Sequence, residues 1–149
     1  MKIKKLISFI NIFLFCILLS TANTFAHEGA KGIIKERMDK FKESKQLMKK
    51  INVGLQNNNF KVIEESAQML LLWSKEMHNF FPKGSDVSPS EASSDIWLNP
   101  EGFSKAIKNF ELASLELINQ SNTNDRDKTI NAFRNLAGTC KGCHQKFRN

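Results

Sequence analysis

The sequence predicts an all-α protein, an antiparallel four-helix bundle, on three observations. Apolar residues recur at alternating steps of three and four in four separate stretches, the pattern of helices that cross at shallow angles. Asparagine-rich or proline-rich segments, which interrupt helices, separate these stretches. Strand signals are weak, because the 149 residues contain no tyrosine and no alternating apolar run bounded by hairpin turns.

The four expected helices cover residues 33–56, 59–81, 100–121 and 125–148. Their apolar series are Ile34, Met38, Phe41, Met48, Ile51 and Leu55; Phe60, Ile63, Ala67, Leu70, Ser74, Met77 and Phe81; Phe103, Ile107, Phe110, Ser114 and Leu117; and Ile130, Phe133, Ala137, Cys140, His144 and Phe147. The polar turn Asn57–Asn59 makes the first two helices antiparallel neighbours. Residues 82–100 hold all three prolines, so this segment either runs the length of the bundle or folds over an edge. Asn124 or Asp125 can cap the last helix.

Residues 1–26 are typical of a secretory signal peptide. A basic start and the apolar run Leu6–Leu19 lead to an A-x-A-like cleavage site at Thr24–Ala26. The alternative is a retained membrane anchor, but the run is short for a full span and is interrupted by Ser8 and Asn11. We therefore expect cleavage after Ala26, a periplasmic protein, and one domain over residues 27–149.

Cleavage changes both the cysteine count and the charge. Cys16 leaves with the signal, so the two remaining cysteines lie in one motif and none is left for a structural disulfide. The signal holds three lysines and no acidic residue, so its removal lowers the net charge from +7 to +4. This charge is spread along the chain, which does not indicate a nucleic-acid-binding protein.

The run Cys140–His144 reads C-x-x-C-H, the attachment signature of a c-type haem. Two thiols three positions apart on a helix can add to the two vinyl groups of one porphyrin, and His144, one turn after Cys140, can reach its iron. A dithiol redox pair is an alternative, although it belongs near a βαβ pattern. A structural zinc site is another, but only His27 and His78 remain as imidazole ligands. Because Cys140 and His144 fall on the apolar series of the last helix, we expect the porphyrin against the bundle interior.

With this motif on the last helix, the mature chain resembles the class II c-type cytochromes, the cytochrome c' family. Three segments carry the resemblance: Gly32–Phe41; Phe81–Pro82 with Ser88–Ala92 and Ile96–Trp97; and Cys140–Arg148. The resemblance implies a left-handed four-helix bundle in the periplasm, frequent homodimers, and either electron transfer with redox partner proteins or binding of diatomic gases. It also implies one covalent haem c per chain, with thioether links at Cys140 and Cys143 and His144 as the proximal iron ligand.

Three further site residues follow from the resemblance. Arg37 would lie near a haem propionate, where a guanidinium can pair with a carboxylate. Glu91 would lie at the haem edge, although a solvated loop carboxylate is the alternative. Arg148 would lie near the proximal His144, or would serve as a favourable charge at a helix C-terminus.

The residue on the distal side of the iron divides this family. That position here is Phe41, whose ring has no lone pair, which predicts a five-coordinate iron with an apolar open face suited to NO or CO. Met38, three residues earlier on the same series, is the alternative as a sixth ligand that would favour electron transfer. Met48 is a remoter candidate. No constellation typical of an enzyme is evident.

Overall fold

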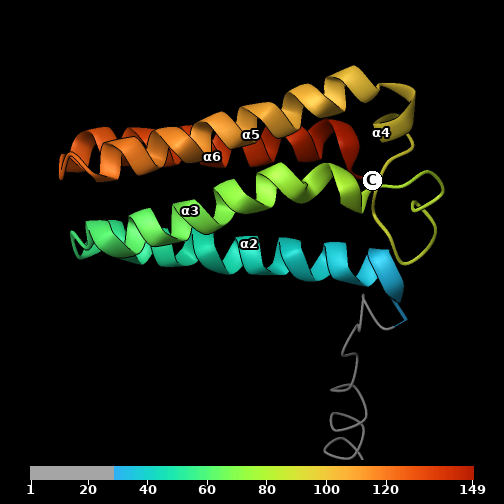
Figure 1. Ribbon diagram of the computed structural model, residues 1–149, viewed down its shortest axis with the longest axis horizontal. Helices are drawn as coiled ribbons and strands as arrows, with labels where there is room; N and C mark the ends of the chain where they lie inside the picture. Colours follow the sequence, from blue (N-terminus) through green and yellow to red (C-terminus); the bar gives the residue numbers. More distant parts are fainter. Residues whose placement is uncertain (1–28) are drawn as a thin grey trace, which may run out of the picture.

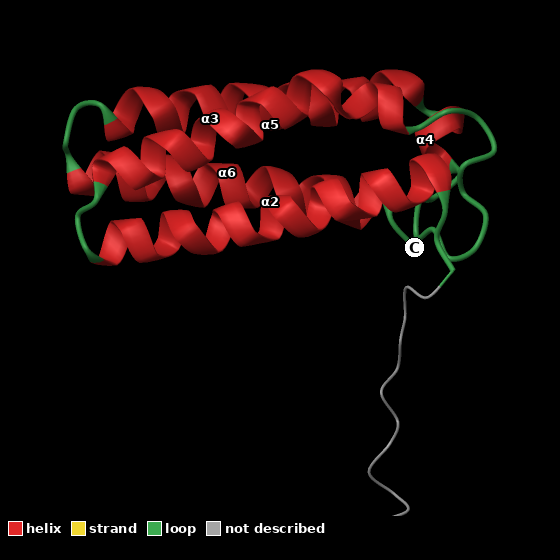
Figure 2. Ribbon diagram, turned by 60° about the horizontal axis from the view of Figure 1, so that its bottom comes forward, coloured by secondary structure: helices red, strands yellow, loops and turns green. Residues whose placement is uncertain are grey.

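The computed structural model describes residues 29–149, in which four long helices form an antiparallel bundle (Figures 1 and 2). These are α2 (Gly32–Gln56), α3 (Phe60–Glu76), α5 (Pro100–Ser121) and α6 (Arg126–Phe147), with a 3₁₀ turn η1 (Met77–Phe80) and a short helix α4 (Asp95–Leu98) between α3 and α5. The predicted fold class is confirmed. The signal peptide predicted for residues 1–26 lies outside the described residues. No helix in the described part of the chain has the length and apolar character that a bilayer span requires.

A tight turn joins α2 to α3, as the three asparagines predict. Asn58 adopts a left-handed conformation with φ of 52°, which asparagine tolerates better than most residues. The Asn59 side chain caps α3 by accepting a hydrogen bond from the backbone N–H of Val62 at 3.2 Å. Beside the turn, a Cβ on Gly54 would lie 2.8 Å from Ile63 Cγ1, so glycine permits the close approach of the two helices.

The segment between α3 and α5 folds over one end of the bundle and does not run along it (Figure 1). Helix α5 therefore begins at the end where α3 finishes, and each long helix is antiparallel to the next (Figure 2). Asn99 starts α5 by accepting a hydrogen bond from Gly102 N–H at 3.0 Å, with Pro100 at the first helical position.

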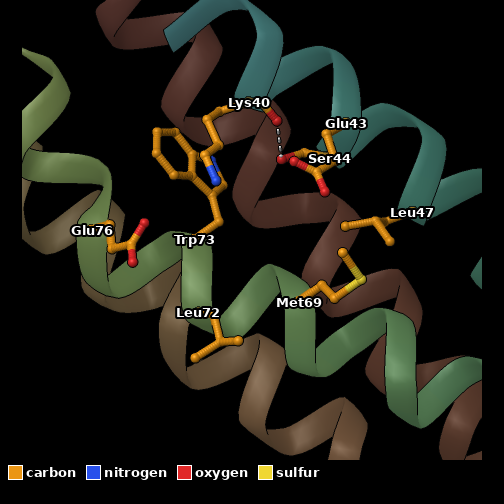
Figure 3. A pocket seen from close by; sticks show the side chains of 8 residues that line it. All are labelled: Lys40, Glu43, Ser44, Leu47, Met69, Leu72, Trp73 and Glu76. Atoms are coloured by element: carbon orange, nitrogen blue, oxygen red, sulfur yellow. Dashed lines mark hydrogen bonds between the residues drawn. The ribbon is translucent and has the colours of Figure 1, made fainter. Parts of the chain in front are cut away.

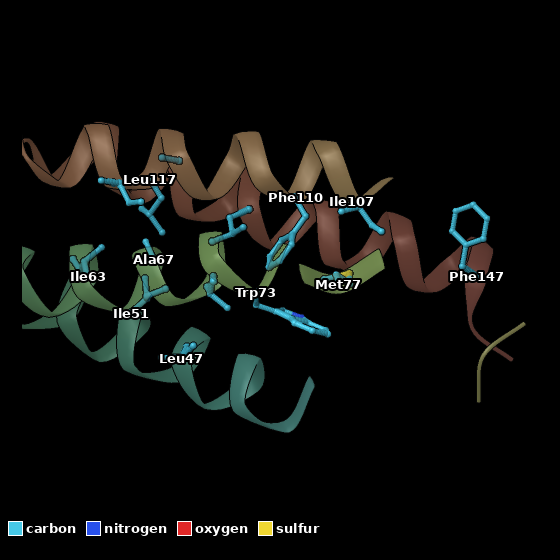
Figure 4. Packing of buried hydrophobic residues seen from close by; sticks show 14 of the residues in the cluster. Leu47, Ile51, Ile63, Ala67, Trp73, Met77, Ile107, Phe110, Leu117 and Phe147 are labelled. Carbon is cyan, nitrogen blue, oxygen red and sulfur yellow. The ribbon is translucent and has the colours of Figure 1, made fainter. Parts of the chain in front are cut away.

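The core has an aliphatic half and an aromatic half (Figure 4). Toward the α2–α3 turn, aliphatic side chains are almost completely excluded from solvent; they include Ile51, Ile63, Leu70 and Leu117. Toward the α3–α5 segment, the buried side chains are mostly larger; they include Trp73, Met77, Phe103, Ile107 and Phe147. The predicted series of α5 is confirmed, and that of α3 is confirmed from Phe60 to Ser74; the buried hydroxyls Ser74 and Ser114 donate to backbone carbonyls of their own helices. The helix expected over residues 59–81 ends earlier, at Glu76, and the chain continues as the 3₁₀ turn η1, so Phe81 lies outside it.

The helices pair unequally around the bundle. Helix α3 packs along both α2 and α5, and α5 packs along α6, whereas α2 and α6 touch only sparsely. The most buried line of α6 runs through Thr129, Ala132 and Leu136, one residue before the series predicted from Ile130.

His144, which the sequence places on the series from Ile130 to Phe147, is exposed, whereas Phe147 at the end of that series is buried. The most buried face of α6 is the one toward α5, because α5 is the helix along which α6 packs most extensively. The predicted series lies on the adjacent face, where Ile130, Phe133 and Ala137 are half-buried.

Candidate haem site

The two cysteines of the C-x-x-C-H run lie on the last turns of α6, where their thiols are free. Both are half-buried and both pack against the hydrophobic core. One helical turn separates them, so the two sulfur atoms project to the same side of α6. This places two addition-competent thiols at the edge of the aromatic half of the core.

The surroundings keep both thiols protonated. Burial raises the pKa of the Cys140 thiol, partly offset by a hydrogen bond with Thr139. Burial, together with the neighbouring Cys140, raises the pKa of the Cys143 thiol to about 11. Redox-active C-x-x-C pairs depend on a lowered thiol pKa, so these environments are unlike those of a dithiol oxidoreductase.

His144 lies on the seam between α6 and α2, facing an aromatic ring of α2. Its imidazole meets the Phe41 ring edge-on, with 6.2 Å between ring centroids. The residue as a whole is exposed, but burial on the ring's inner side lowers the pKa of His144, with a further lowering from Arg148 and an opposing effect of Glu91. A neutral imidazole retains the lone pair that an iron ligand needs.

Aromatic rings enclose this part of the seam. Phe41 contacts Trp73 with centroids 5.6 Å apart and Phe81 at 6.4 Å, both edge-on. The series continues through Phe81 to Phe103 at 4.9 Å and on to Phe147 at 5.3 Å. These rings create an apolar lining of the kind that surrounds a porphyrin.

Arg37 is buried beside the same rings, with only 3% of its surface exposed. Its two terminal nitrogens donate four hydrogen bonds, of 2.7–2.9 Å, to the segment after α3; the acceptors are Phe80 O, Ser85 Oγ, Ser85 O and Ser90 Oγ. The guanidinium also lies 4.5 Å from the centroid of Phe81. Burial lowers the pKa of Arg37, and Asp86 partly counters this. Within residues 29–149 no carboxylate lies within ion-pair distance of it.

Trp73 supplies a polar group that the described chain leaves unsatisfied. The residue is 4% exposed, and its indole Nε1–H is buried without an acceptor. On its outer side Trp73 also lines a pocket of about 190 Å³ between α2 and α3, with the Lys40 ammonium 5.9 Å from its ring (Figure 3). That pocket contains neither a thiol nor an imidazole, and it is separate from the site on α6.

The C-terminal end of α6 is tied to the segment before α4. Arg148 forms an ion pair with Glu91, and both side chains are about half exposed. The backbone adds hydrogen bonds from Ser93 N to Phe147 O at 3.0 Å and from Asn149 N to Glu91 O at 2.9 Å. The structure therefore brings Glu91 and Arg148, both predicted site residues, into direct contact near His144.

Met38 and Phe41, the two residues considered for the distal side, differ in their surroundings. Phe41 packs against the core cluster and meets His144 directly. Met38 is half-buried and is not among the side chains packed against that cluster. Arg37, immediately before Met38, takes the buried position.

The residues present fit a covalently bound porphyrin. Two protonated thiols and an imidazole lie on consecutive turns of one helix, beside an aromatic lining and an orphaned indole N–H. The sequence profile of the cytochrome c' family matches residues 32–148. The chain belongs to the cytochrome c' family. Accordingly it is a haem c protein, because members of this family carry covalently attached haem c.

The chain is also similar in sequence and in fold to individual cytochromes c'. The chain is 36% identical over 69 residues to cytochrome c' of Rhodospirillum rubrum, which is 46% of this chain and 47% of that protein, or about half its length. It is 32% identical over 89 residues to cytochrome c' of Rubrivivax gelatinosus, covering 59% of this chain and 69% of that one. The crystal structure of the Rubrivivax gelatinosus protein superposes with a TM-score of 0.70 at 26% identity, over 78% of this chain and 94% of that one.

Sequence reasoning missed several residues of the site. Trp73 lies one helical turn from Leu70 and Met77 on the buried face of α3, so its burial was detectable from spacing, but its unsatisfied N–H was not. Ser85 and Ser90, which accept from Arg37, occur in a proline-rich segment whose path no periodicity predicts.

Proposed function

We propose that this cytochrome c' is a periplasmic protein that carries single electrons and binds small neutral gases at an open haem iron. Cys140 and Cys143 would hold the cofactor through thioether bonds, and His144 would ligate the iron from the proximal side. The periplasmic location rests on the signal peptide predicted for residues 1–26.

The edge-on meeting of Phe41 and His144, at 6.2 Å between centroids, is the observation that carries this proposal. The side chain of α2 that faces the proximal ligand is a hydrocarbon ring, which offers no electron pair to a metal. Phe41 is supported on its other sides by Trp73 and Phe81, so it cannot easily turn away. An apolar, crowded distal side favours small neutral ligands over charged or strongly hydrogen-bonding ones.

When bound, haem c supplies a one-electron iron couple and a metal position for a diatomic gas. The chain's own residues provide the surroundings. Trp73 offers a buried N–H, and Arg37 a buried positive charge, to an acidic group of the cofactor. Arg37 would act mainly through its charge, since its terminal N–H groups already bind the 80–90 segment.

Two alternatives compete with an open iron. In the first, Met38 supplies a thioether as sixth ligand and the protein is only an electron carrier; its position outside the core cluster speaks against this. In the second, Cys140 and Cys143 form a thiol oxidoreductase; the raised pKa values of both thiols speak against that.

The spin state of the purified ferric holoprotein, and the response of the ferrous form to CO, test the proposal. We expect a high-spin ferric spectrum and a clear spectral change with CO. Phe41→Met should introduce a competing thioether, convert the ferric spectrum to low spin and weaken CO binding by about tenfold or more.

Met38→Ala is the matched control, because it removes the other thioether and should leave spin state and CO binding unchanged. A low-spin wild-type spectrum that CO does not alter, and that Met38→Ala converts to high spin, would establish the six-coordinate alternative. Absence of covalent haem after expression with a complete cytochrome maturation system would favour the thiol oxidoreductase.

A further inference from the structure

A cationic groove lies on the outside of the bundle between α5 and α6. It is open to solvent and has a volume of about 620 Å³. Lys105 from α5 and Arg134 and Lys146 from α6 line it, and no carboxylate of the described chain does. All three cationic residues are exposed.

These charges are not neutralised by the protein itself. The ion pairs of the described chain involve other cationic residues, namely Lys35, Lys61, Lys108, Lys128 and Arg148. The sequence reinforces the pattern, because residues 128–149, which cover almost all of α6, contain no acidic residue. The groove therefore presents a local positive potential to the solvent.

Glycine and asparagine residues line the groove beside the cationic side chains. Gly138 and Gly142, one turn apart on α6, both have open space where a Cβ would be. Asn109 and Asn135 add amide groups that can donate to or accept from a partner. The two glycines leave the α6 wall of the groove without side chains at these positions, so carboxylate groups of a partner can approach the helix closely.

The groove also reaches the haem attachment motif. Cys143 lines the groove and at the same time packs against the hydrophobic core. Phe147, one turn later, does the same and continues into the aromatic series through Phe103. One wall of the groove is thus shared with the site that holds the cofactor.

We infer that this groove is the docking surface for an acidic electron-transfer protein. The inference rests on the electron-transfer part of the proposed function. A partner docked in the groove would come nearest to the cofactor at Cys143, which lines the groove and would carry one of the thioether bonds. Lys105, Arg134 and Lys146 steer and orient the partner by charge, and the two glycines let it approach α6 closely. Complementary charges of this type mainly set association rate and salt dependence.

Binding of oxidised flavodoxin, an acidic redox protein, to the ferric holoprotein tests the inference without any electron being transferred. Titration calorimetry at low ionic strength should give a 1:1 complex that weakens by about tenfold or more between 20 and 200 mM salt. The triple variant Lys105→Glu, Arg134→Glu, Lys146→Glu should weaken it by about thirtyfold or more at low salt.

A second triple variant, Lys45→Glu, Lys49→Glu, Lys50→Glu, is the matched control. It changes the net charge equally, at exposed positions of α2, and should weaken binding by less than about threefold. Equal weakening by both variants would show attraction to net charge alone and would overturn the inference, as would no weakening by either. Groove-dependent binding to phosphatidylglycerol vesicles, with none to flavodoxin, would overturn it in favour of a lipid surface.

Haem content and the ferric spectrum of each variant separate this inference from the function on which it rests. A wild-type protein without covalent haem would refute the proposed function whatever the calorimetry shows. Normal haem content with unchanged flavodoxin binding in the groove variant would refute the docking surface alone.

Discussion

At the scale of single residues, Arg37 contributes most to the order around the site. Its guanidinium is nearly inaccessible to water and donates to four oxygen atoms of a segment more than forty positions away. Such a group stabilises a fold only if its hydrogen bonds are made, because an unsatisfied buried charge is costly. Arg37 therefore couples the first turns of α2 to the path of residues 80–90.

Arg37→Met tests this coupling, because methionine keeps an apolar stem and removes every donor. The free energy of unfolding of the holoprotein should fall by about 2–4 kcal/mol, since several hydrogen bonds to a charged group are lost and Ser85 Oγ and Ser90 Oγ are left without that donor. Guanidinium unfolding followed by circular dichroism measures the change.

Lys35→Met is the control, on the same helix and in an exposed ion pair with Asp39. Its effect should stay within about 0.5 kcal/mol, as for other surface ion pairs. An equally small effect of Arg37→Met would mean that the 80–90 segment holds its path without the guanidinium.

The Arg37 network also shows what single-sequence reasoning could not reach. The residue was recognisable from its place in a family motif, and a propionate partner was the natural expectation. Within the described chain its acceptors are two serine hydroxyls and two backbone carbonyls, in a segment without periodicity. Hydrogen bonds between residues more than forty positions apart depend on the path of the intervening loop, and the spacing of apolar residues does not predict that path.

At the scale of elements, α6 is the helix that matters for function, and it is fixed at both ends. At its start, Asp125 Oδ1 accepts hydrogen bonds from the backbone N–H groups of Asp127 at 3.1 Å and Lys128 at 3.0 Å. At its end, the ion pair of Glu91 with Arg148 and the backbone hydrogen bonds of Phe147 and Asn149 hold the last turn. The turn carrying Cys143 and His144 is therefore held against the segment before α4.

Helix boundaries were largely predictable, but helix faces were less so. The asparagine turn, the prolines and the Asp125 cap are local signals, and the ends of the long helices lie within one residue of the expected positions except the end of α3, which stops at Glu76 and continues as a 3₁₀ turn. The most buried residues of α6, Thr129, Ala132 and Leu136, each precede by one position the residues predicted to be buried, Ile130, Phe133 and Ala137. Thr129 is fully buried because its hydroxyl donates to Gln120 O and Asp125 O, a pairing that a search for apolar residues does not detect.

Asp125→Ala tests the cap of α6, and its effect should depend on pH. Hydrogen bonds from the Lys128 backbone and side chain are the main causes that lower the pKa of Asp125 below its ordinary value of 3.8. A carboxyl group with a lowered pKa stabilises the fold above its unfolded pKa and loses that contribution as pH falls through the folded value. Thermal unfolding should therefore show a loss of stability at pH 7 that shrinks near pH 3.

Asp127→Ala serves as control, because its carboxylate lies in the same first turn but makes none of the cap's hydrogen bonds. Its smaller effect should reflect the helix dipole alone. If the two variants lose equal stability at pH 7, the cap makes no specific contribution.

At the scale of the whole molecule, the bundle divides into two halves with different needs. The half near the α2–α3 turn is filled by aliphatic side chains that pack without help, such as Ile51, Ile63 and Leu117. The half near the α3–α5 segment contains the aromatic series, an orphaned indole and a buried guanidinium. These are features of a lining that is completed by a large apolar cofactor.

Cofactor removal should therefore loosen one half of the molecule more than the other. The double variant Cys140→Ser, Cys143→Ser cannot form thioether bonds and should lack covalent haem. Because folding buries the attached porphyrin and allows His144 to ligate its iron, a chain without haem loses these interactions, and its melting temperature should fall by about 10 °C or more. Hydrogen exchange should show amides of residues 77–98 and 140–147 losing protection by about tenfold or more, while amides around Ile51 and Ile63 retain most of theirs.

Haem-free protein with both thiols intact, made without the maturation system, is the control for the two serine substitutions and should behave like the double variant. A uniform loss of protection along all four helices would mean that the bundle folds as one unit and that the aliphatic half has no independent stability.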